Sequence, residues 1–315
     1  MLRFVIAAVT GLCLICGADV APADLVQTID AHYAPVNALD ITPDGTVIFS
    51  GSQDGHIKLW DASTYEMTLD VPACQVAVND IAVSPDGAFV VSASEDGYVK
   101  VWDALTAELL WAIPAHKGSA TCVAISPDSL VIYSGGDDGF IRAWAVEDGY
   151  PMTMEVFAHY NGVNDLLLNG EGSYIFSGGV DGFVKVYNTN DFALESTIKA
   201  YEQGEVLVLK LNSLESCLAT GGTNGELRIW DAATGSLAKK VRAHAGNVTC
   251  LGFTDDGNHA ISGGEDGKIK LWNREGELAG EMQAHVLGLR DFITGAENLI
   301  TAGADFKIRV WKKNF

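Results

Sequence analysis

A short pattern returns seven times along this chain: Ser or Thr, then Asp or Asn four residues later, then Trp or Tyr six residues after that. The aromatic residue recurs every 39 to 43 residues, at Trp60, Trp102, Trp144, Tyr187, Trp230, Trp272 and Trp311. A fixed period of this length is typical of repeat architectures, in which each repeat buries its apolar face against its neighbours. We therefore expect one array of seven equivalent units.

Each repeat carries the signals of short β-strands. Runs rich in Val, Ile, Phe and Tyr alternate with turn residues such as Pro43-Asp44-Gly45 and Asp54-Gly55. Asp-Gly between apolar runs is a strong hairpin signal. Four such runs fit into each repeat, and none has a helical period of useful length. The sequence therefore predicts an all-β fold, a seven-bladed β-propeller of four-stranded antiparallel blades.

The two ends of the chain predict how the ring closes. Four residues follow Trp311, which is too few for the last repeat to form its own outer strand. A spare strand precedes the first repeat, at residues 25–29. We expect this N-terminal strand to complete the last blade, because the pairing would cover an open sheet edge.

Charge limits the class of partner. The chain holds 20 basic and 41 acidic residues, which gives a formal net charge of −21 and a pI near 4.5. Nucleic acid is not an expected partner, because its binding depends mainly on the neutralisation of phosphates by basic side chains. Basic proteins or cations suit this surface, and solubility by itself is the simpler explanation of the charge.

The first 23 residues have the layout of a secretory signal peptide. A single Arg near the start is followed by an apolar stretch over residues 4–16 and then by small residues. We expect a signal peptide over 1–23, cleaved after Ala18 or Ala23, and a propeller over 24–315 exported to the periplasm or the extracellular space. The stretch is too short to span a membrane comfortably, so no membrane span is expected after cleavage. The alternatives are a cytoplasmic protein with an unprocessed tail and a retained anchor.

Two further features bear on export without deciding it. Cys122 and Cys250 occupy equivalent positions in repeats three and six, and we expect them to be small core residues. Asn247 begins an Asn-x-Thr sequon, which would matter in a secreted eukaryotic protein. The compartment and the state of Asn247 stay open at this point.

No pattern for catalysis or cofactor binding accompanies the repeats. The chain has no glycine-rich phosphate loop, no metal-spaced His/Glu motif and no Gly-x-Ser-x-Gly elbow. Five of the seven histidines share one repeating position, but one His per blade keeps them too far apart to hold a metal together. We expect no cofactor, no metal and no enzymatic activity.

The repeats resemble the WD40 family. The family's Gly-His-like dipeptide reads Ala-His here, at residues 31–32, 115–116, 158–159, 243–244 and 284–285. Its Trp-Asp dipeptide is intact at 60–61, 102–103 and 230–231 and is relaxed in the other four repeats. The resemblance runs from Asp24 to the end of the chain. It implies a seven-bladed propeller closed by its N-terminal strand, and it implies a platform for other proteins.

In this family the His, the turn Asp, the strand Ser or Thr and the Trp form a buried hydrogen-bonded tetrad. The resemblance implies five such structural tetrads here: His32, Asp54, Ser50 and Trp60; His116, Asp138, Ser134 and Trp144; His159, Asp181, Ser177 and Tyr187; His244, Asp266, Ser262 and Trp272; and His285, Asp305, Thr301 and Trp311.

Two repeats depart from the tetrad. Cys74 takes the His position in repeat two, so Asp96 is expected to lack its donor. Tyr201 and Asn224 stand in repeat five, so His and Asp are lost together there, which avoids a buried carboxylate without its partner. We expect blades two and five to be the loosest of the ring.

The resemblance also indicates where a partner binds. The family favours the narrow face, which is formed by the loops that enter the innermost strands and by the turns that carry the Asp. Loops on a rigid scaffold are common sites of function. The candidate partner-binding residues on this face are Tyr33, Asn37, Gln53, Asn79, Glu95, Lys117, Asp137, Tyr160, Asn164, Glu205, Asn247, Glu265 and Arg290.

The expected function is that of a non-enzymatic scaffold that docks a polar or basic peptide segment of a protein partner on the narrow face. Tyr33 and Tyr160 are the expected anchors, because aromatic residues dominate interface hot spots. The alternative is an enzyme or a small-ligand sensor that uses the axial channel. Against it, the channel-side positions of the narrow face lack His and lack several convergent acids. An intracellular scaffold is the further alternative if the N-terminus is not processed.

Overall fold

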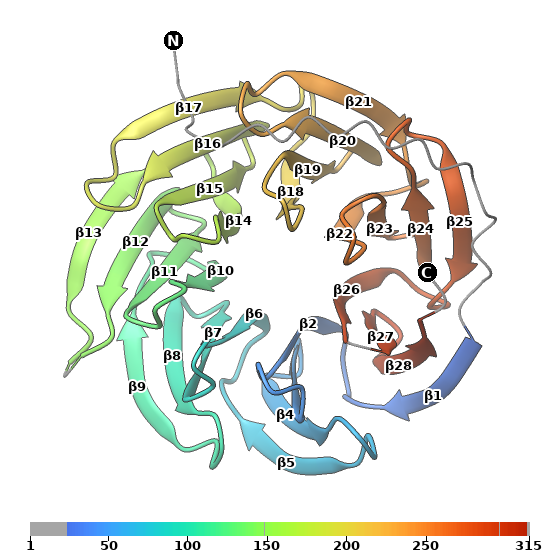
Figure 1. The fold of residues 1–315 in the computed structure, drawn as a ribbon. Helices are drawn as coiled ribbons and strands as arrows, with labels where there is room; N and C mark the ends of the chain where they lie inside the picture. Colours follow the sequence, from blue (N-terminus) through green and yellow to red (C-terminus); the bar gives the residue numbers. More distant parts are fainter. Residues whose placement is uncertain (1–23, 148, 296, 314–315) are drawn as a thin grey trace.

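The chain forms a ring of seven antiparallel sheets around a central axis (Figure 1). The structure is a computed structural model that describes residues 24–147, 149–295 and 297–313. Each sheet has four strands, and its first strand along the chain is innermost, except in the last blade, where chain order differs. The predicted all-β, seven-bladed propeller is confirmed. The expected signal peptide lies outside the described residues.

The first four blades follow one another along the chain. Blade one contains β2 (Val36–Ile41), β3 (Val47–Ser52), β4 (His56–Asp61) and β5 (Met67–Pro72). Blade two contains β6 (Val78–Val83), β7 (Phe89–Ser94), β8 (Tyr98–Asp103) and β9 (Leu109–Pro114). Blade three contains β10 (Ala120–Ile125), β11 (Val131–Gly136), β12 (Phe140–Ala145) and β13 (Met152–Phe157). Blade four contains β14 (Val163–Leu168), β15 (Tyr174–Gly179), β16 (Phe183–Asn188) and β17 (Leu194–Lys199).

The last three blades include the closure of the ring. Blade five contains β18 (Val206–Leu211), β19 (Cys217–Gly222), β20 (Glu226–Asp231) and β21 (Leu237–Arg242). Blade six contains β22 (Val248–Phe253), β23 (Ala260–Gly264), β24 (Lys268–Trp272) and β25 (Leu278–Gln283). Blade seven contains β26 (Leu289–Thr294), β27 (Asn298–Gly303), β28 (Lys307–Lys312) and β1 (Asp24–Asp30).

The N-terminal strand completes the last blade, as predicted. Strand β1 pairs antiparallel with β28, with Leu25 opposite Trp311 and Ile29 opposite Ile308. The sheet order is β1-β28-β27-β26, so one end of the chain covers the edge that the other end leaves open (Figure 1).

The Asp-Gly turns join each blade to the loop that follows it. Gly55 has a φ of +81°, which favours glycine, and a Cβ there would lie 2.4 Å from the carbonyl oxygen of Cys74. The Gly55 carbonyl in turn accepts the N–H groups of Ala73 and Cys74, over 2.9 and 3.0 Å. The absent side chain therefore lets the turn and the loop between blades one and two bond backbone to backbone.

The apolar core is divided among the seams between neighbouring blades. One cluster of buried side chains contains Trp60 of blade one together with Ile300 and Ile308 of blade seven. Another contains Phe89 of blade two together with Trp144 of blade three. Each seam is thus a small core of its own, and the ring closes only when all seven seams pack.

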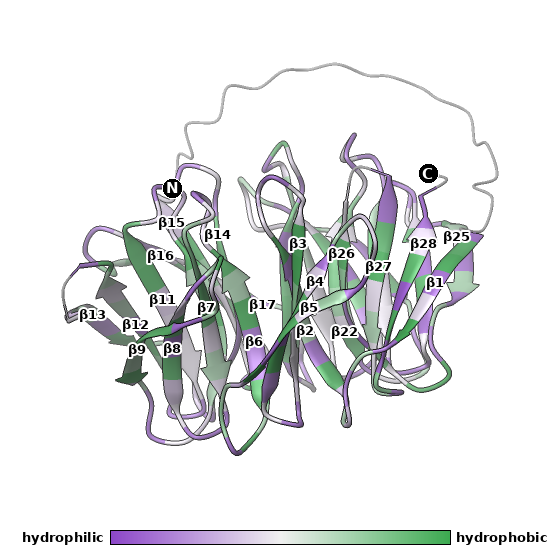
Figure 2. Cartoon of the chain, turned by 90° about the horizontal axis from the view of Figure 1, so that it is seen from below, coloured by the Kyte–Doolittle hydropathy of each residue, from purple (hydrophilic) through white to green (hydrophobic). Residues whose placement is uncertain are grey.

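Two faces formed by loops and turns cap the ring, with the strands running between them (Figure 2). The loops that enter the innermost strands and the turns that carry the Asp lie together on the narrow face; for example, Gln53 N donates to Pro35 O over 2.9 Å. The opposite face carries the turns between the first and second strands and between the third and fourth strands of each blade.

Candidate interaction surface

Four hydrogen-bonded side chains, a tetrad, link the loop, the turn and two strands of blade one. Nδ1 of His32 lies 3.0 Å from Asp54 Oδ2, and its Nε2 lies 2.8 Å from Ser50 Oγ. The Trp60 indole N–H donates to the same Ser50 oxygen over 2.9 Å. Because Nδ1 faces a carboxylate, it carries the proton, and Nε2 accepts from the Ser50 hydroxyl.

The His32 imidazole of this tetrad is neutral. Burial lowers the pKa of His32 to about 4, although Asp54 acts to raise it. Burial by itself would raise the pKa of Asp54, but the Tyr33 N–H, the His32 ring and the His56 N–H outweigh it and hold that pKa below its usual value. A ring with such a low pKa is a poor general base at neutral pH, so the tetrad holds loops in place.

Blades three, six and seven contain the same hydrogen-bonded tetrad. The Nδ1-to-carboxylate distances are 2.9 Å for His116 and Asp138, 2.8 Å for His244 and Asp266, and 2.7 Å for His285 and Asp305. Each Nε2 lies 2.8 Å from its hydroxyl, on Ser134, Ser262 and Thr301. The indole donors of Trp144, Trp272 and Trp311 reach these hydroxyls over 2.9 to 3.0 Å.

Blade four has three linked members in place of four. His159 lies 2.8 Å from both Asp181 and Ser177. Tyr187 fills the position of the Trp and is buried, but it has no indole N–H. Among the described residues, no hydrogen bond joins its hydroxyl to Ser177.

In blade two the hydrogen-bonded tetrad is interrupted at Cys74, which replaces the histidine. The Trp102 indole still donates to Ser92 over 2.9 Å. Asp96 accepts instead from the Ser94 hydroxyl, over 2.5 Å, and from the Tyr98 N–H. The turn and the strand are therefore each satisfied locally, and no side chain in the described structure joins Asp96 to Ser92.

In blade five a tyrosine replaces the imidazole. Tyr201 is 1% exposed, and its hydroxyl lies 2.9 Å from Thr220 O and 3.2 Å from Thr220 Oγ1. The Trp230 indole donates to that Thr220 hydroxyl over 3.1 Å. The longer phenol reaches the strand that the family's histidine reaches, so blade five keeps a link that blade two has lost.

The tetrads also fix the backbone of the residue that follows each histidine. Oδ2 of Asp54, which also faces His32, accepts the Tyr33 N–H over 2.9 Å. In Asp138 and Asp181 the oxygen not bonded to the histidine accepts the N–H groups of Lys117 and Tyr160 over 3.1 and 3.2 Å. A buried hydrogen-bonded network thus holds the base of each exposed side chain on the narrow face.

The two tyrosines on this rim are open to solvent. Tyr33 is 88% exposed and Tyr160 is 69% exposed. The Lys58 ammonium lies 5.4 Å from the Tyr33 ring centre, and Phe157 packs edge-on against Tyr160 at 5.3 Å. They lie in the loops that lead into β2 and β14, two strands on separate parts of the ring (Figure 1). A partner that contacts both would have to extend across the face.

Three asparagines predicted on the narrow face bond across the seams between blades. The side-chain amides of Asn37, Asn79 and Asn164 donate to the first residue of the next innermost strand, Val78 O over 2.9 Å, Ala120 O over 2.8 Å and Val206 O over 2.9 Å. These amides are therefore partly engaged in joining blades, which leaves fewer of their polar groups open to a partner.

The other predicted residues divide by exposure. Asn247 donates to Glu265 from its backbone N–H and from its side chain, both over 3.1 Å, and Glu265 itself is exposed. Arg290 is half-buried, and its buried Nε has no hydrogen-bond partner among the described residues. Glu205 is half-buried beside Asn164. The other exposed members of the set, besides Glu265, are Gln53, Glu95, Lys117 and Asp137.

Sequence reasoning missed an apolar patch on the same face, formed by Tyr33, Val286, Leu287 and Phe306. Val286 is 83% exposed and Leu287 is 53% exposed. The backbone carbonyl of Phe306 accepts the N–H of His32 over 3.2 Å, which brings blade seven to the base of Tyr33. The available signal was positional, because Val286 follows His285 as Tyr33 follows His32.

Sequence reasoning also missed four acids on the innermost strands, here called the seam carboxylates: Asp40, Asp80, Asp165 and Asp291. Each accepts its own following backbone N–H and the N–H of a residue in the next blade. The bonds across the seams run to Val83 over 2.7 Å, Val123 over 2.9 Å, Leu209 over 2.6 Å and Leu39 over 2.8 Å. Their oxygens are thus used to join blades.

The seam carboxylates have unusual acidities. Burial raises the pKa of Asp80 to about 8, that of Asp165 to about 7 and that of Asp291 to about 6, although their backbone hydrogen bonds oppose the change. Burial likewise raises the pKa of Asp40. Such values are also found in catalytic acids. Here both oxygens of each carboxylate already accept backbone donors, which favours a structural role.

Metal binding and membrane insertion each require a recognisable arrangement of residues. Within the described part of the chain, no group of His, Cys, Asp and Glu side chains is arranged to hold a metal ion. The residues that the structure describes also include no helix with the length and apolar character needed to cross a membrane. Cys122 and Cys250 are buried with free thiols.

Comparison with known proteins gives two findings. The family described as "WD domain, G-beta repeat" matches this chain over residues 23–61, 66–103, 107–145, 152–188 and 235–273, more than half of its length. Part of the chain is similar to WD repeat-containing protein 18 of Danio rerio, with 29% identity over 94 residues. That alignment covers 25% of this chain and 22% of the relative, so the chain matches about a fifth of the relative's length.

Proposed function

This chain belongs to the WD40 repeat family, and on that premise we propose that it is a non-enzymatic scaffold whose narrow face docks a peptide segment of a protein partner. The observation that carries the proposal is the contrast, at Tyr33 on the narrow face, between an exposed side chain and a fixed backbone. Tyr33 is 88% exposed, while its backbone N–H is held by Asp54 within a buried tetrad. An exposed aromatic on a fixed backbone loses little conformational entropy on binding.

The proposed partner segment is polar or basic and carries an apolar anchor. Exposed acids lie on the narrow face at Glu95, Asp137 and Glu265, and the whole chain has a formal net charge of −21. Complementary charge speeds encounter and disfavours acidic partners. The apolar patch of Tyr33, Val286, Leu287 and Phe306 offers contact area for the anchor.

A peptide library displayed on phage tests this proposal. The wild-type propeller should enrich peptides that are net basic and contain an aromatic or large aliphatic residue. The triple variant Tyr33→Ala, Tyr160→Ala, Glu265→Lys should bind those peptides at least tenfold more weakly. The control triple variant on the opposite face, Leu105→Ala, Leu214→Ala, Glu171→Lys, should bind them as the wild type does. Equal affinity for the first triple variant and the wild type would overturn the proposal.

We also propose that the protein is exported after removal of its N-terminal segment. The support is the layout of residues 1–23 and the position of β1, which begins at Asp24 and leaves the ring-closing strand intact after cleavage at either expected site. The intact mass of the protein purified from its native source is the test. A chain that begins at Asp19 or Asp24 supports export, and a chain that retains residue 1 overturns it.

A further inference from the structure

In each of blades one to six, one residue in the turn between the third and fourth strands adopts a left-handed backbone and faces the preceding blade. We call it the plug position. In five of these blades its N–H closes the turn onto the residue after the blade's aromatic, as in the 2.7 Å bond from Tyr65 N to Asp61 O and the 2.8 Å bond from Gly235 N to Asp231 O. In blade three the Tyr150 N–H donates to Glu147 O over 2.9 Å. The φ angles are +59° at Tyr65, +55° at Ala107, +53° at Phe192 and +67° at Gly235.

Aromatic residues fill the seam from this position in three blades. The Tyr65 hydroxyl accepts from Asn298 of blade seven over 2.8 Å. Tyr150 packs on Trp111 of blade two, with ring centres 5.9 Å apart. Phe192 packs on Tyr133 of blade three at 6.3 Å. In each case a ring inserts from one blade against the blade before it.

A second residue faces the same part of each seam, from the outer strand of the preceding blade. It lies opposite the residue before the aromatic, as Trp111 lies opposite Val101 and Ser196 lies opposite Val186. In five of the six seams that have a plug position, at least one of the two residues is large; the pairs are Gln27 with Tyr65, Leu69 with Ala107, Trp111 with Tyr150, Met154 with Phe192, and Lys239 with Gly276.

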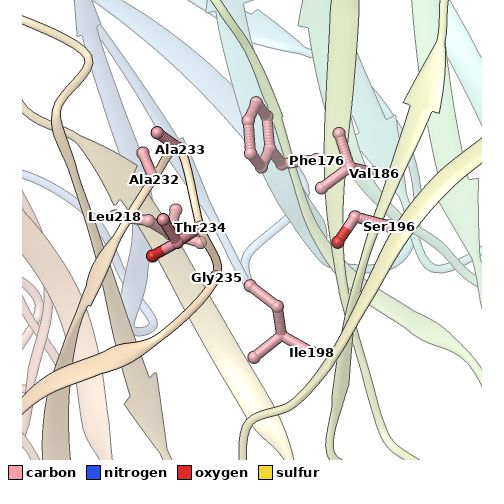
Figure 3. A pocket seen from close by; sticks show the side chains of 9 residues that line it. All are labelled: Phe176, Val186, Ser196, Ile198, Leu218, Ala232, Ala233, Thr234 and Gly235. Atoms are coloured by element: carbon pink, nitrogen blue, oxygen red, sulfur yellow. The ribbon is translucent and has the colours of Figure 1, made fainter. Parts of the chain in front are cut away.

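The seam between blades four and five is the exception, because Ser196 and Gly235 are both small. A pocket of about 110 Å³ opens there (Figure 3). Blade four lines it with Phe176, Val186, Ser196 and Ile198, and blade five lines it with Leu218, Ala232, Ala233, Thr234 and Gly235. The pocket is therefore the space that a ring occupies in the equivalent seams.

We propose that this pocket docks one aromatic side chain, preferably the phenol ring of a tyrosine, from a protein partner. Phe176 stands where Tyr133 receives Phe192, so an inserted ring would meet an aromatic neighbour as the internal plugs do. Among the described residues the Ser196 hydroxyl has no hydrogen-bond partner. It lines the same wall of the pocket as Phe176, with Val186 between the two on the middle strand (Figure 3). At about 110 Å³ the pocket is smaller than the enclosed apolar cavity of roughly 150 Å³ that binds benzene, so the phenol ring would enter it in part.

This site is separate from the narrow face. The plug turn lies on the opposite face of the ring, so a partner could use either surface without the other. Failure of the pocket experiment leaves the narrow-face proposal standing, and the reverse also holds.

Two variants close the pocket from opposite sides. Gly235→Tyr reproduces Tyr65, whose φ of +59° shows that this turn accepts a side chain there. Ser196→Trp reproduces Trp111 on the other wall. The matched control is Gly45→Tyr, since Gly45 also has a positive φ of +72°, and a Cβ added there would meet no atom within 4 Å apart from those of its chain neighbours.

Methyl NMR with capped tripeptides is the decisive measurement. Acetyl-Gly-Tyr-Gly-amide should shift the methyl signals of Val186, Ile198 and Leu218 in the wild type and in Gly45→Tyr, and should leave them unshifted in both closed variants. Acetyl-Gly-Leu-Gly-amide should bind at least tenfold more weakly. Addition of p-cresol, the side-chain analogue of tyrosine, should displace the Tyr peptide from the wild type, which tests the site even if a closed variant does not fold.

Three results would overturn the proposal. The first is no methyl shift with the Tyr peptide at millimolar concentration. The second is an equal shift in Gly235→Tyr and the wild type. The third is binding of p-cresol without any binding of the Tyr peptide, which would make the pocket a site for small free aromatics and not a docking site for protein.

Discussion

Blades two and five both lack the histidine of the repeat, and they differ in what replaces it. In blade five the Tyr201 phenol crosses to Thr220 and restores the link between loop and strand. In blade two the Cys74 thiol is too short, and its sulfur lies 3.0 Å from Val76 O within its own loop. The tetrad thus depends on a side chain that reaches the strand hydroxyl, and an imidazole is one of two solutions in this chain.

At the seams with the next blade, blade two makes more side-chain hydrogen bonds than blade five. Blade two bonds to blade three through Asn79 and the seam carboxylate Asp80. Blade five has Leu207 and Val208 at the equivalent positions, and within the described chain neither side chain makes a polar bond to blade six. Blade two is therefore weaker within itself and better joined to its neighbour, and blade five is the opposite.

The largest effect that tests this comparison is expected from Tyr201→Ala. Removal of a fully buried ring should lower the free energy of unfolding by about 3–5 kcal/mol. Cys74→Ala should cost about 1 kcal/mol, because a half-buried thiol that makes no link is lost. Chemical denaturation of both variants gives the two values. Similar losses for the two would show that Tyr201 does not replace the tetrad.

The next largest effect is expected at the seam between blades two and three, where Asp80 joins the two blades. Asp80→Ala leaves the Val123 N–H without its acceptor and should cost about 1–3 kcal/mol. Asp44→Ala is the matched control, since Asp44 is an exposed carboxylate with hydrogen bonds confined to its own turn. Its free energy of unfolding should change by about 0.5 kcal/mol or less. A small loss for Asp80→Ala would mean that the seam carboxylates do not join blades.

The pH dependence of stability separates the seam carboxylates from the tetrads. Asp80 has a pKa of about 8 in the folded chain, above the ordinary value of 3.8, so the folded state binds more protons than the unfolded state between these values and stability falls as pH rises through that window. The tetrad histidines act with the opposite sign, because the pKa of His32 is lowered from 6.5 to about 4 and stability is lost on acidification below 6.5.

Above pH 7 the histidines are largely neutral in both states. Burial also raises the pKa of the Cys122 and Cys250 thiols, which lowers stability in the same direction at the alkaline end of this range. The difference between the wild type and Asp80→Asn therefore isolates the carboxylate. We therefore expect the Tm to fall from pH 7 to pH 9 at constant ionic strength, and to fall less in Asp80→Asn. A thermal scan at each pH measures both curves. A wild-type Tm that rises steadily across this range would contradict the raised pKa values of Asp80 and Asp165.

The smallest effect is a repair of blade two. Cys74→His should restore the link from Asp96 to Ser92 and raise the free energy of unfolding by about 0.5–1 kcal/mol. Blade one shows that an imidazole is compatible with serine at this register position, because it holds His32 with Ser52 opposite Val36, and Ser94 stands at the equivalent position of blade two, opposite Val78. Hydrogen exchange of the Trp102 indole should slow in the variant. Unchanged exchange would indicate that blade two is not loosened by the loss of its histidine.

Much of the fold followed from the period of the sequence. The number of blades, the four strands in each and the closure by the N-terminal strand were all predicted, because each rests on signals within one repeat or on a count of residues at the two ends. The equality expected between blades two and five did not anticipate the reach of Tyr201. A phenol differs from an imidazole in length, and only the packed loop shows where its hydroxyl arrives.

The candidate surface was predicted in position and less well in detail. The sequence placed Tyr33 and Tyr160 on one rim, but it treated Asn37 as a surface residue, whereas its amide donates across a seam. For Val286 the signal was its position after His285, which was not used. Nothing within the repeat of Asp80 shows that its carboxylate bonds to the next blade.

The sequence by itself determined what is repeated in this protein: the blade, its turns and the residues available for each tetrad, because these contacts join residues within one period. The tertiary structure decided what happens between periods. The seam carboxylates, the asparagine bonds and the pocket at Ser196 and Gly235 join residues on different blades, about 40 positions apart or, for Asp291 and Leu39, 252 positions apart. No single repeat encodes the angle and spacing of these blades. Two small residues become a pocket only because the packing of neighbouring blades places them in the same seam.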